Sequence, residues 1–176
     1  NAHDKTLRAG AGIVGHVDDI VDLSQPVLTL HRVVPLDWLD YNGHMTESRY
    51  LQAFADSTDR FMEMIGCDAE YIASGGSYFT AETHIRHLDE VHAGAKITVR
   101  TQVILGEGKK MHLFHSMREG ERLLATGEHM LLHVDLATRR AAPPAAQVEA
   151  ALVKVATAHA SLPAPEGLGR AVGAPR

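Results

Sequence analysis

One stretch of the sequence fixes most of what this chain can fold into. Between Thr46 and Gly66 large apolar side chains recur at steps of three and four residues, which is the period of an amphipathic α-helix. Thr46 suits the N-cap position and Gly66 suits the end. We therefore expect a helix of about five turns, whose bulky stripe makes it the central buried helix. The stripe consists of Tyr50, Leu51, Phe54, Thr58, Phe61, Met62 and Ile65.

The rest of the chain is rich in segments that alternate as β-strands do. Short turns join the later segments, so neighbouring strands should run antiparallel. In the second segment we expect Phe79, Thr83 and Ile85 to share one face, with Glu82 and Arg86 on the other. The predicted fold is α+β, with a curved five-stranded antiparallel sheet wrapped around one long helix. The expected strands are residues 27–34, 78–88, 97–105, 111–117 and 123–135.

Composition along the chain suggests three parts. Residues 1–25 are polar and glycine-containing, and we expect an N-terminal extension or linker. Residues 26–142 form the predicted domain. Residues 143–176 begin with a Pro-Pro pair, continue with an alanine-rich helix and end in a flexible tail.

Charge and cysteine content exclude several classes of function. The 176 residues carry 17 basic and 22 acidic side chains, a formal net charge of −5, so no nucleic-acid or membrane partner is expected. No run approaches the roughly 18–20 apolar residues that a membrane-spanning helix needs. The single cysteine, Cys67, favours a reducing compartment, and the expected location is cytoplasmic. The 12 histidines lack an evident metal-binding spacing, so neither a metal nor a resident cofactor is expected.

The segment just before the long helix is where chemistry is expected. The sequence Asp40-Tyr41-Asn42-Gly43-His44 is typical of a tight turn. A helix start offers unpaired amides and a positive dipole end, which can polarise a carbonyl and stabilise an oxyanion. Asp40 could act there as nucleophile or general base. The alternative is purely structural, with Asp40 and Asn42 serving only the turn and His44 bonding only to backbone.

The pattern Trp38-x-Asp40-Tyr41-Asn42-Gly43-His44-Met45, followed by Tyr50, resembles the hotdog-fold acyl-CoA thioesterases of the 4-hydroxybenzoyl-CoA thioesterase type. The resemblance implies that Asp40 is the catalytic carboxylate. It also implies that the amides of Gly43, His44 and Met45 hold the thioester oxygen, with His44 as a possible polariser and coenzyme A as part of the substrate. Thr46 is a candidate substrate contact, but it departs from the family pattern, because many relatives have asparagine at this position. Homodimers or dimers of dimers are expected, with sites at the subunit interface.

A narrower resemblance links the chain to the thioesterase domain associated with bacterial carnitine dehydrogenases, either fused to that enzyme or encoded beside it. It is carried by residues 82–88, 112–115 and 128–135. The implied substrate is betainyl-CoA, whose quaternary ammonium is attracted by aromatic faces. Trp38, Tyr41, Tyr78 and Glu82 are therefore candidate substrate contacts, together with Asn42. Glu82 could instead be a structural partner of Arg86.

Two other functions stay open on the sequence alone. A non-catalytic acyl-CoA-binding module would have the same fold. A hydratase or dehydratase needs a paired aspartate and histidine for proton transfer, and Asp40 with His44 could imitate that pair.

Overall fold

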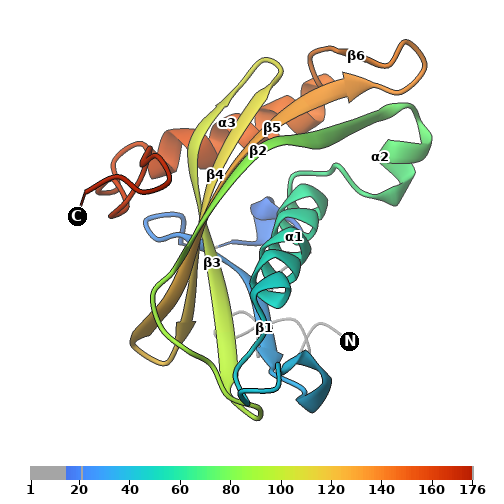
Figure 1. Ribbon diagram of the computed structural model, residues 1–176. Coiled ribbons are helices and arrows are strands. Elements are labelled where there is room, and N and C mark those ends of the chain that lie inside the picture. Colours follow the sequence, from blue (N-terminus) through green and yellow to red (C-terminus); the bar gives the residue numbers. More distant parts are fainter. Residues whose placement is uncertain (1–14, 21, 176) are drawn as a thin grey trace, which may run out of the picture.

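The structure is a computed structural model that describes residues 15–20 and 22–175. A strongly curved antiparallel sheet wraps around one long helix, α1 (Figure 1). The main elements are β1 (Val27–Val33), α1 (Glu47–Met64), β2 (Gly76–His87), β3 (Lys96–Glu107), β4 (Lys110–Glu119), β5 (Arg122–Asp135), β6 (Arg140–Ala141) and α3 (Ala146–His159). Shorter helical turns are η1 (Val17–Asp19), η2 (Leu36–Trp38) and α2 (Ala69–Ala73).

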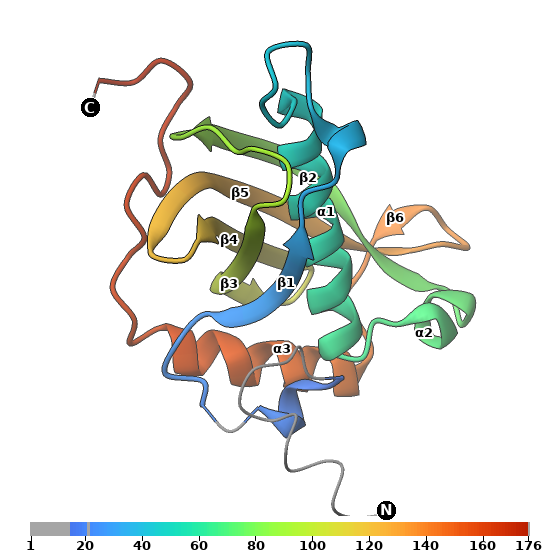
Figure 2. The same cartoon turned by 90° about the horizontal axis from the view of Figure 1, so that it is seen from below.

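The strands lie in the order β1-β3-β4-β5-β2, all antiparallel, and this confirms the predicted curved sheet (Figure 2). The two-residue β6 adds a sixth strand beside β5. It is too short to show an alternating pattern, so the sequence did not predict it. On the path, β1 and β2 are the two edge strands, and β2 offers a long edge of 12 residues.

Helix α1 has the predicted length and supplies the centre of the core. Its aromatic side chains Tyr50, Phe54 and Phe61 are buried between the helix and the concave face of the sheet. Fully burying a side chain of this size contributes about 1.5–3 kcal/mol. Gly127 of β5 lets the helix approach closely, because a Cβ there would lie 2.7 Å from Cδ2 of Phe54. The helix is thus fixed against the sheet by close packing.

The alternation expected for β2 is wrong at its beginning. The pairing of β2 with β5 shifts between Thr80 and Glu82, which is a β-bulge. Before the bulge Tyr78 faces the helix and Phe79 is 56% exposed, whereas after it Thr83 takes the inner side. One extra residue reverses the face of every side chain that precedes it. The sequence cannot show such a bulge, because the residues on both sides of it alternate regularly.

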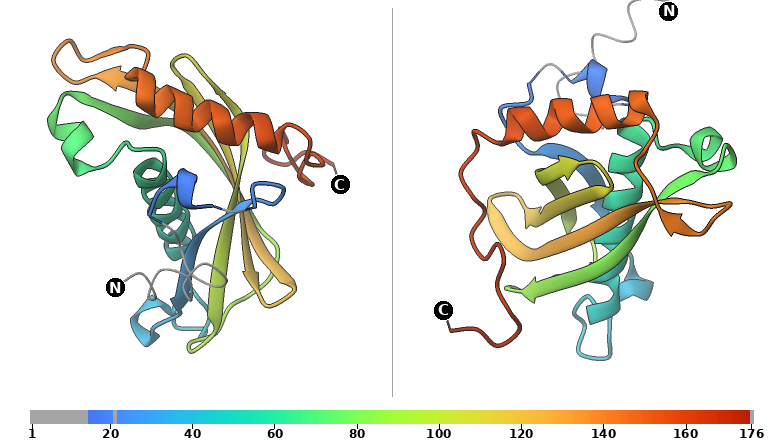
Figure 3. Two further views of the ribbon diagram at one scale, coloured as in Figure 1. Left: turned by 180° about the vertical axis from the view of Figure 1, so that it is seen from behind. Right: turned by 90° about the horizontal axis from the view of Figure 1, so that it is seen from above.

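Helix α3 closes one end of the curl, as the view from behind shows (Figure 3). Leu152 packs onto β3 at Gly106, where a Cβ would lie 2.7 Å from Cγ of Leu152. Nδ1 of His159 accepts a 3.0 Å hydrogen bond from the amide of Val103. The helix expected at residues 145–160 is therefore present, and it packs on the domain.

The segments outside the predicted domain also contact it. Val17 is fully buried in the main core, and Glu128 accepts hydrogen bonds from the amide of Gly169 at 2.8 and 3.0 Å. The predicted N-terminal extension comprises residues 1–25, and most of these lie outside the described residues. The division into three parts therefore stays a prediction. Among the described residues, no helix is both long and apolar enough to span a membrane.

Candidate active site

The loop that precedes α1 folds back on itself around Asp40. Leu39 and Met45 form a β-bridge, and the amide of Asp40 donates to the carbonyl of His44 at 2.8 Å. The amide of Gly43 donates to the carbonyl of Asp40 at 3.0 Å, and Gly43 has a φ of 81°. Such a left-handed conformation favours glycine, so the Asn-Gly pair in the motif has a local structural reason.

The Asp40 carboxylate is held in one orientation by this loop. Its Oδ1 accepts hydrogen bonds from the amides of Asn42 at 2.8 Å and His44 at 3.2 Å. No described group donates to Oδ2, and the side chain is only half-buried. Asn42 takes part in this arrangement through its backbone amide, as expected for a residue that serves the turn. The geometry leaves one carboxylate oxygen available to a substrate.

The three amides that were expected to hold the thioester oxygen already have acceptors within the chain. The amide of Gly43 is bonded to Asp40, that of His44 to the Asp40 carboxylate, and that of Met45 to the carbonyl of Val91 at 2.7 Å. Thr46 occupies the N-cap position, but its amide donates to the carbonyl of Trp38 at 2.9 Å and its side chain makes no capping bond.

The unpaired amides therefore lie one turn further along the chain. Glu47 and Ser48 open α1, and within the described residues no loop or cap group accepts from either amide. The first-turn amides of a helix lack partners in the helix itself. They are the donors that the positive end of the α1 dipole offers to a carbonyl oxygen.

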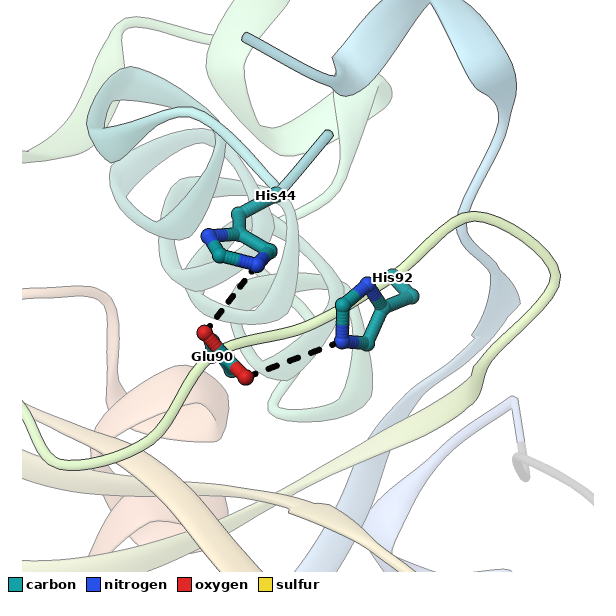
Figure 4. A group of neighbouring side chains, drawn as sticks. All are labelled: His44, Glu90 and His92. Atoms are coloured by element: carbon teal, nitrogen blue, oxygen red, sulfur yellow. Dashed lines mark ion pairs between the residues drawn. The ribbon is translucent and has the colours of Figure 1, made fainter. Parts of the chain in front are cut away.

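His44 makes a contact that the sequence did not predict. Its Nε2 lies 3.0 Å from Oε2 of Glu90, and Nε2 of His92 lies 3.8 Å from Oε1 of the same carboxylate (Figure 4). The imidazole of His44 thus faces Glu90, whereas the Asp40 carboxylate bonds to backbone amides. The aspartate–histidine pair of a hydratase is not formed. The bond from Met45 to Val91 brings these two distant segments together, and no sequence spacing indicates it.

Two of the predicted aromatic contacts have other environments. Trp38 is buried in the core, and the guanidinium carbon of Arg32 lies 4.0 Å from the centre of its ring, with Arg49 at 5.5 Å. The ring of Trp38 is thus already in contact with a cationic side chain of the same chain. Tyr41 projects from the loop tip and is 98% exposed. The substrate contacts expected from these two residues stay predictions.

A largely apolar pocket of about 350 Å³ lies between α1, β2 and β5. Two of its lining residues carry a buried polar atom, Oη of Tyr78 and Nε2 of His129, that has no hydrogen-bond partner among the described residues. Burial raises the pKa of Tyr78 and lowers the pKa of His129 to about 4, so both are neutral at pH 7. Such unsatisfied groups cost free energy unless a ligand or water pairs with them. The pocket is lined by Leu51, Ala55, Thr58, Asp59, Met62, Tyr78, Thr80, Thr83, His129 and Leu131.

A chain of buried hydrogen bonds behind this pocket has a defined direction. Thr29 donates its hydroxyl proton to the carbonyl of Val99 at 3.2 Å, so the 2.8 Å contact with Thr101 is donated by Thr101. Thr101 then accepts from Nδ1 of His115 at 2.8 Å, and Nε2 of His115 accepts from Thr58 at 2.8 Å. Burial lowers the pKa of His115, in agreement with a neutral ring. Thr58 therefore presents only lone pairs to the pocket.

Asp59 supplies the negative charge at this pocket. It is exposed at the pocket wall, and desolvation together with the neighbouring Asp56 and Glu63 raises its pKa. A cation bound beside Asp59 would relieve this clustering of negative charge. His129 and Asp59 were not identified from the sequence. Asp59 looks like an ordinary charge on the polar side of an amphipathic helix.

Glu82 lies on the outer face of the sheet instead. It lines a separate pocket of about 310 Å³ with Glu128, His112 and Arg170. The expected structural pairing is also absent, because Arg86 lies against Glu166, at 3.9 Å, at the C-terminal segment. The sheet separates Glu82 from the inner pocket.

Asp40 and the inner pocket lie at different places along α1. The helix residues that line the pocket begin at Leu51, about 6 Å along the axis from Glu47, and end at Met62, about 22 Å from Glu47, at about 1.5 Å per residue. Most of the pocket thus lies well beyond the start of the helix, where the Asp40 loop ends.

A long helix inside a curled antiparallel sheet, with an aspartate loop at the start of the helix, defines a hotdog-fold protein of the thioesterase class. Residues 34–152 match the Thioesterase-like superfamily, and the chain belongs to this family.

Curated relatives carry more specific names. Over 175 residues the chain is 68% identical to the L-carnitine dehydrogenase/betainyl-CoA thioesterase of Ruegeria pomeroyi, with 99% of this chain but 35% of that protein covered. The chain thus spans about a third of the length of that relative. The betainyl-CoA thioesterase of Pseudomonas aeruginosa is 42% identical over 156 residues, with 87% of this chain and 98% of that protein covered.

Solved structures agree on the fold. A candidate thioesterase of Pseudomonas putida KT2440 superposes with a TM-score of 0.74 at 34% identity, covering 86% of this chain and 99% of that one. The hypothetical protein SAV2348 of Staphylococcus aureus, solved in complex with CoA, has a TM-score of 0.79 at 25% identity, covering 85% and 97%.

Proposed function

We propose that this chain hydrolyses acyl-CoA thioesters and that betainyl-CoA is its substrate. The observation that carries the proposal is the Asp40 carboxylate, held by two loop amides in the loop that leads directly into the unpaired amides of Glu47 and Ser48. The names of the Ruegeria and Pseudomonas aeruginosa relatives support the acyl group. The Ruegeria name and its length also support a link to a carnitine dehydrogenase. An acyl-CoA substrate and the buried thiol of Cys67 fit the cytoplasm as the location.

In the proposed reaction the thioester oxygen faces the first-turn amides of α1. Their dipoles stabilise the negative charge that develops when the carbonyl carbon becomes tetrahedral. Asp40 either attacks that carbon, forming an anhydride that water then cleaves, or removes a proton from the attacking water. Both routes consume one water and release the free acid and coenzyme A. The thiolate is a good leaving group, so no strong general acid is required.

We infer that the working unit is a homodimer, or a dimer of dimers, with each site shared between two chains. The outer edge of β2 has no strand beside it among the described residues, and the exposed Phe79 belongs to this strand. A free edge of 12 residues invites pairing with a second copy. A twofold axis at this edge would allow Asp40 of one chain to approach the inner pocket of its partner.

The inner pocket is the proposed place of the acyl group. A trimethylammonium has no N–H to donate, so it prefers apolar walls, an aromatic ring and a nearby negative charge. Leu51, Met62 and Leu131 supply the walls, Tyr78 the ring and Asp59 the charge. In this proposal Asp59 attracts the quaternary ammonium, a role that the sequence-based prediction gives to Glu82 and Trp38.

A thiol-release assay with a pair of matched substrates tests the proposal. Betainyl-CoA and 3,3-dimethylbutyryl-CoA have the same shape and differ in the charge of the quaternary centre. We expect wild type to prefer betainyl-CoA, and Asp40→Asn to lower kcat by about 10²-fold or more on both substrates. Hydrolysis by Asp40→Asn at the wild-type rate would remove Asp40 from the reaction and favour a different catalytic group.

A second variant pair tests the acyl pocket separately. Asp59→Asn should lower kcat/KM for betainyl-CoA by about tenfold, or about 1.4 kcal/mol, and leave the neutral substrate nearly unchanged. Glu107→Gln, which removes an exposed carboxylate at the end of β3, is the matched control and should change neither value. An equal loss on both substrates would show that Asp59 does not recognise the cation. Incubation with crotonyl-CoA checks for water addition without thiol release, which only a hydratase would give.

A further inference from the structure

Three metal-binding side chains meet next to the candidate active site. His44 extends from the loop before α1, and Glu90 and His92 extend from the loop between β2 and β3. The Glu90 carboxylate lies between the two imidazoles and presents one oxygen to each (Figure 4). The three candidate ligand atoms all lie within 4.8 Å of one another.

The two loops that carry these side chains are fixed relative to each other. The amide of Met45 donates to the carbonyl of Val91 at 2.7 Å, and the Val91 side chain is fully buried in the core. Val91 therefore anchors the position between Glu90 and His92, while Met45 anchors the position next to His44. Such an arrangement is preorganised, because little further ordering is needed to bring the three ligands together.

The donor set and its spacing suit one class of ion. In a tetrahedral zinc site with bonds of about 2.0–2.1 Å, neighbouring ligand atoms lie about 3.3 Å apart. Nε2 of His44 lies 3.0 Å from Oε2 of Glu90 and Nε2 of His92 lies 3.8 Å from Oε1, so the two imidazoles face different oxygens of one carboxylate at separations close to that value. Two imidazoles and one carboxylate favour zinc and similar divalent transition-metal ions over magnesium or calcium, which prefer oxygen ligands.

We propose that His44, Glu90 and His92 form a binding site for one divalent transition-metal ion of the zinc class, with the fourth position open. The three side chains are 37%, 54% and 62% exposed, so an ion can enter from solvent and keep a water or substrate ligand. The ion would tie the Asp40 loop to the loop between β2 and β3. The proposal does not depend on thioester hydrolysis. The competing explanation is a pair of surface histidine–glutamate contacts with no affinity for metal.

Direct metal titration separates these explanations. The full chain, treated with EDTA and dialysed, is titrated with Co²⁺, whose visible bands report tetrahedral coordination by nitrogen and oxygen, and then with Zn²⁺ in competition. We expect one ion per chain in wild type. Glu90→Gln and His92→Asn should each weaken binding by at least about tenfold, the lower limit for disturbing even the outer shell of a metal site. His31→Asn, which removes an exposed histidine from β1, is the matched control and should bind as wild type does.

Several results would overturn the site. The proposal is wrong if wild type shows no saturable binding of Co²⁺ or Zn²⁺. It is equally wrong if Glu90→Gln and His92→Asn bind the ion as tightly as wild type does. Circular dichroism checks that both variants keep their fold, as expected for exposed side chains. Each variant tests the metal site independently of the other. Asp40→Asn should keep full metal affinity even where hydrolysis is lost. Failure of the metal site and failure of the proposed hydrolysis are thereby distinguishable.

Discussion

Acidification should destabilise this protein through the buried ring of His129. The side chain is 2% exposed, and burial lowers its pKa from the ordinary value of 6.5 to about 4. Below pH 6.5 the unfolded chain binds a proton at this histidine, while the folded chain does not until the pH approaches 4. Stability therefore falls as the pH falls through this interval.

The size of the effect follows from the two pKa values. A difference of about 2.5 units corresponds to about 3 kcal/mol once the pH lies below both values. At pH 5 the unfolded state is protonated at His129 almost completely and the folded state hardly at all, so about 2 kcal/mol of that loss is already present. Burial lowers the pKa of His115 as well, which adds to the loss in the same direction.

Urea unfolding at pH 7.5 and pH 5.0 measures this loss. His129→Gln removes the titrating group, so the difference in the free energy of unfolding between the two pH values should be about 2 kcal/mol smaller in the variant than in wild type. His31→Gln, an exposed histidine, should behave as wild type does. All samples need one chain concentration, because association contributes to apparent stability. Equal pH dependence in wild type and His129→Gln would refute the reasoning.

Three further predictions concern packing and burial. Gly127→Ala should lower the free energy of unfolding by about 1–3 kcal/mol, because its Cβ would collide with the buried Phe54 ring; a neutral result in urea unfolding would mean that the helix can move away. Burial raises the pKa of Cys67 to about 11, so Ellman's reagent at pH 8 should label it slowly in the folded protein and fully in guanidinium, and fast labelling of the folded state would contradict this. Tyr78→Phe should leave the free energy of unfolding unchanged or raise it by about 1 kcal/mol, because the buried Oη has no partner among the described residues; a clear loss in the same assay would reveal a hidden hydrogen bond.

Local periodicity was sufficient to predict the main elements. The spacing of Tyr50, Phe54 and Phe61 predicts α1 over its whole length, because one buried stripe repeats with the helical period. Alternation and turns likewise predict the five long strands. Asp40 was identified from its neighbours, since a turn motif directly before a helix N-cap is a local signal.

Tertiary structure decided which of the candidate groups are free and which lie together. The amides of Gly43 and Met45 are consumed by contacts that the sequence does not show, so the available donors are those of Glu47 and Ser48. A single bulge in β2 decides that Tyr78 rather than Phe79 faces the helix.

Long-range contacts decided the rest. Glu90 reaches His44 because Val91 accepts a hydrogen bond from Met45, and His129 meets the inner pocket because β5 pairs with β2. The amino-acid sequence by itself determines periodic patterns and turns, because their cause lies within a few residues. Pairing, bulges and burial join residues that are distant in the chain, so only the folded chain determines the available donors, the pocket and the proposed metal site.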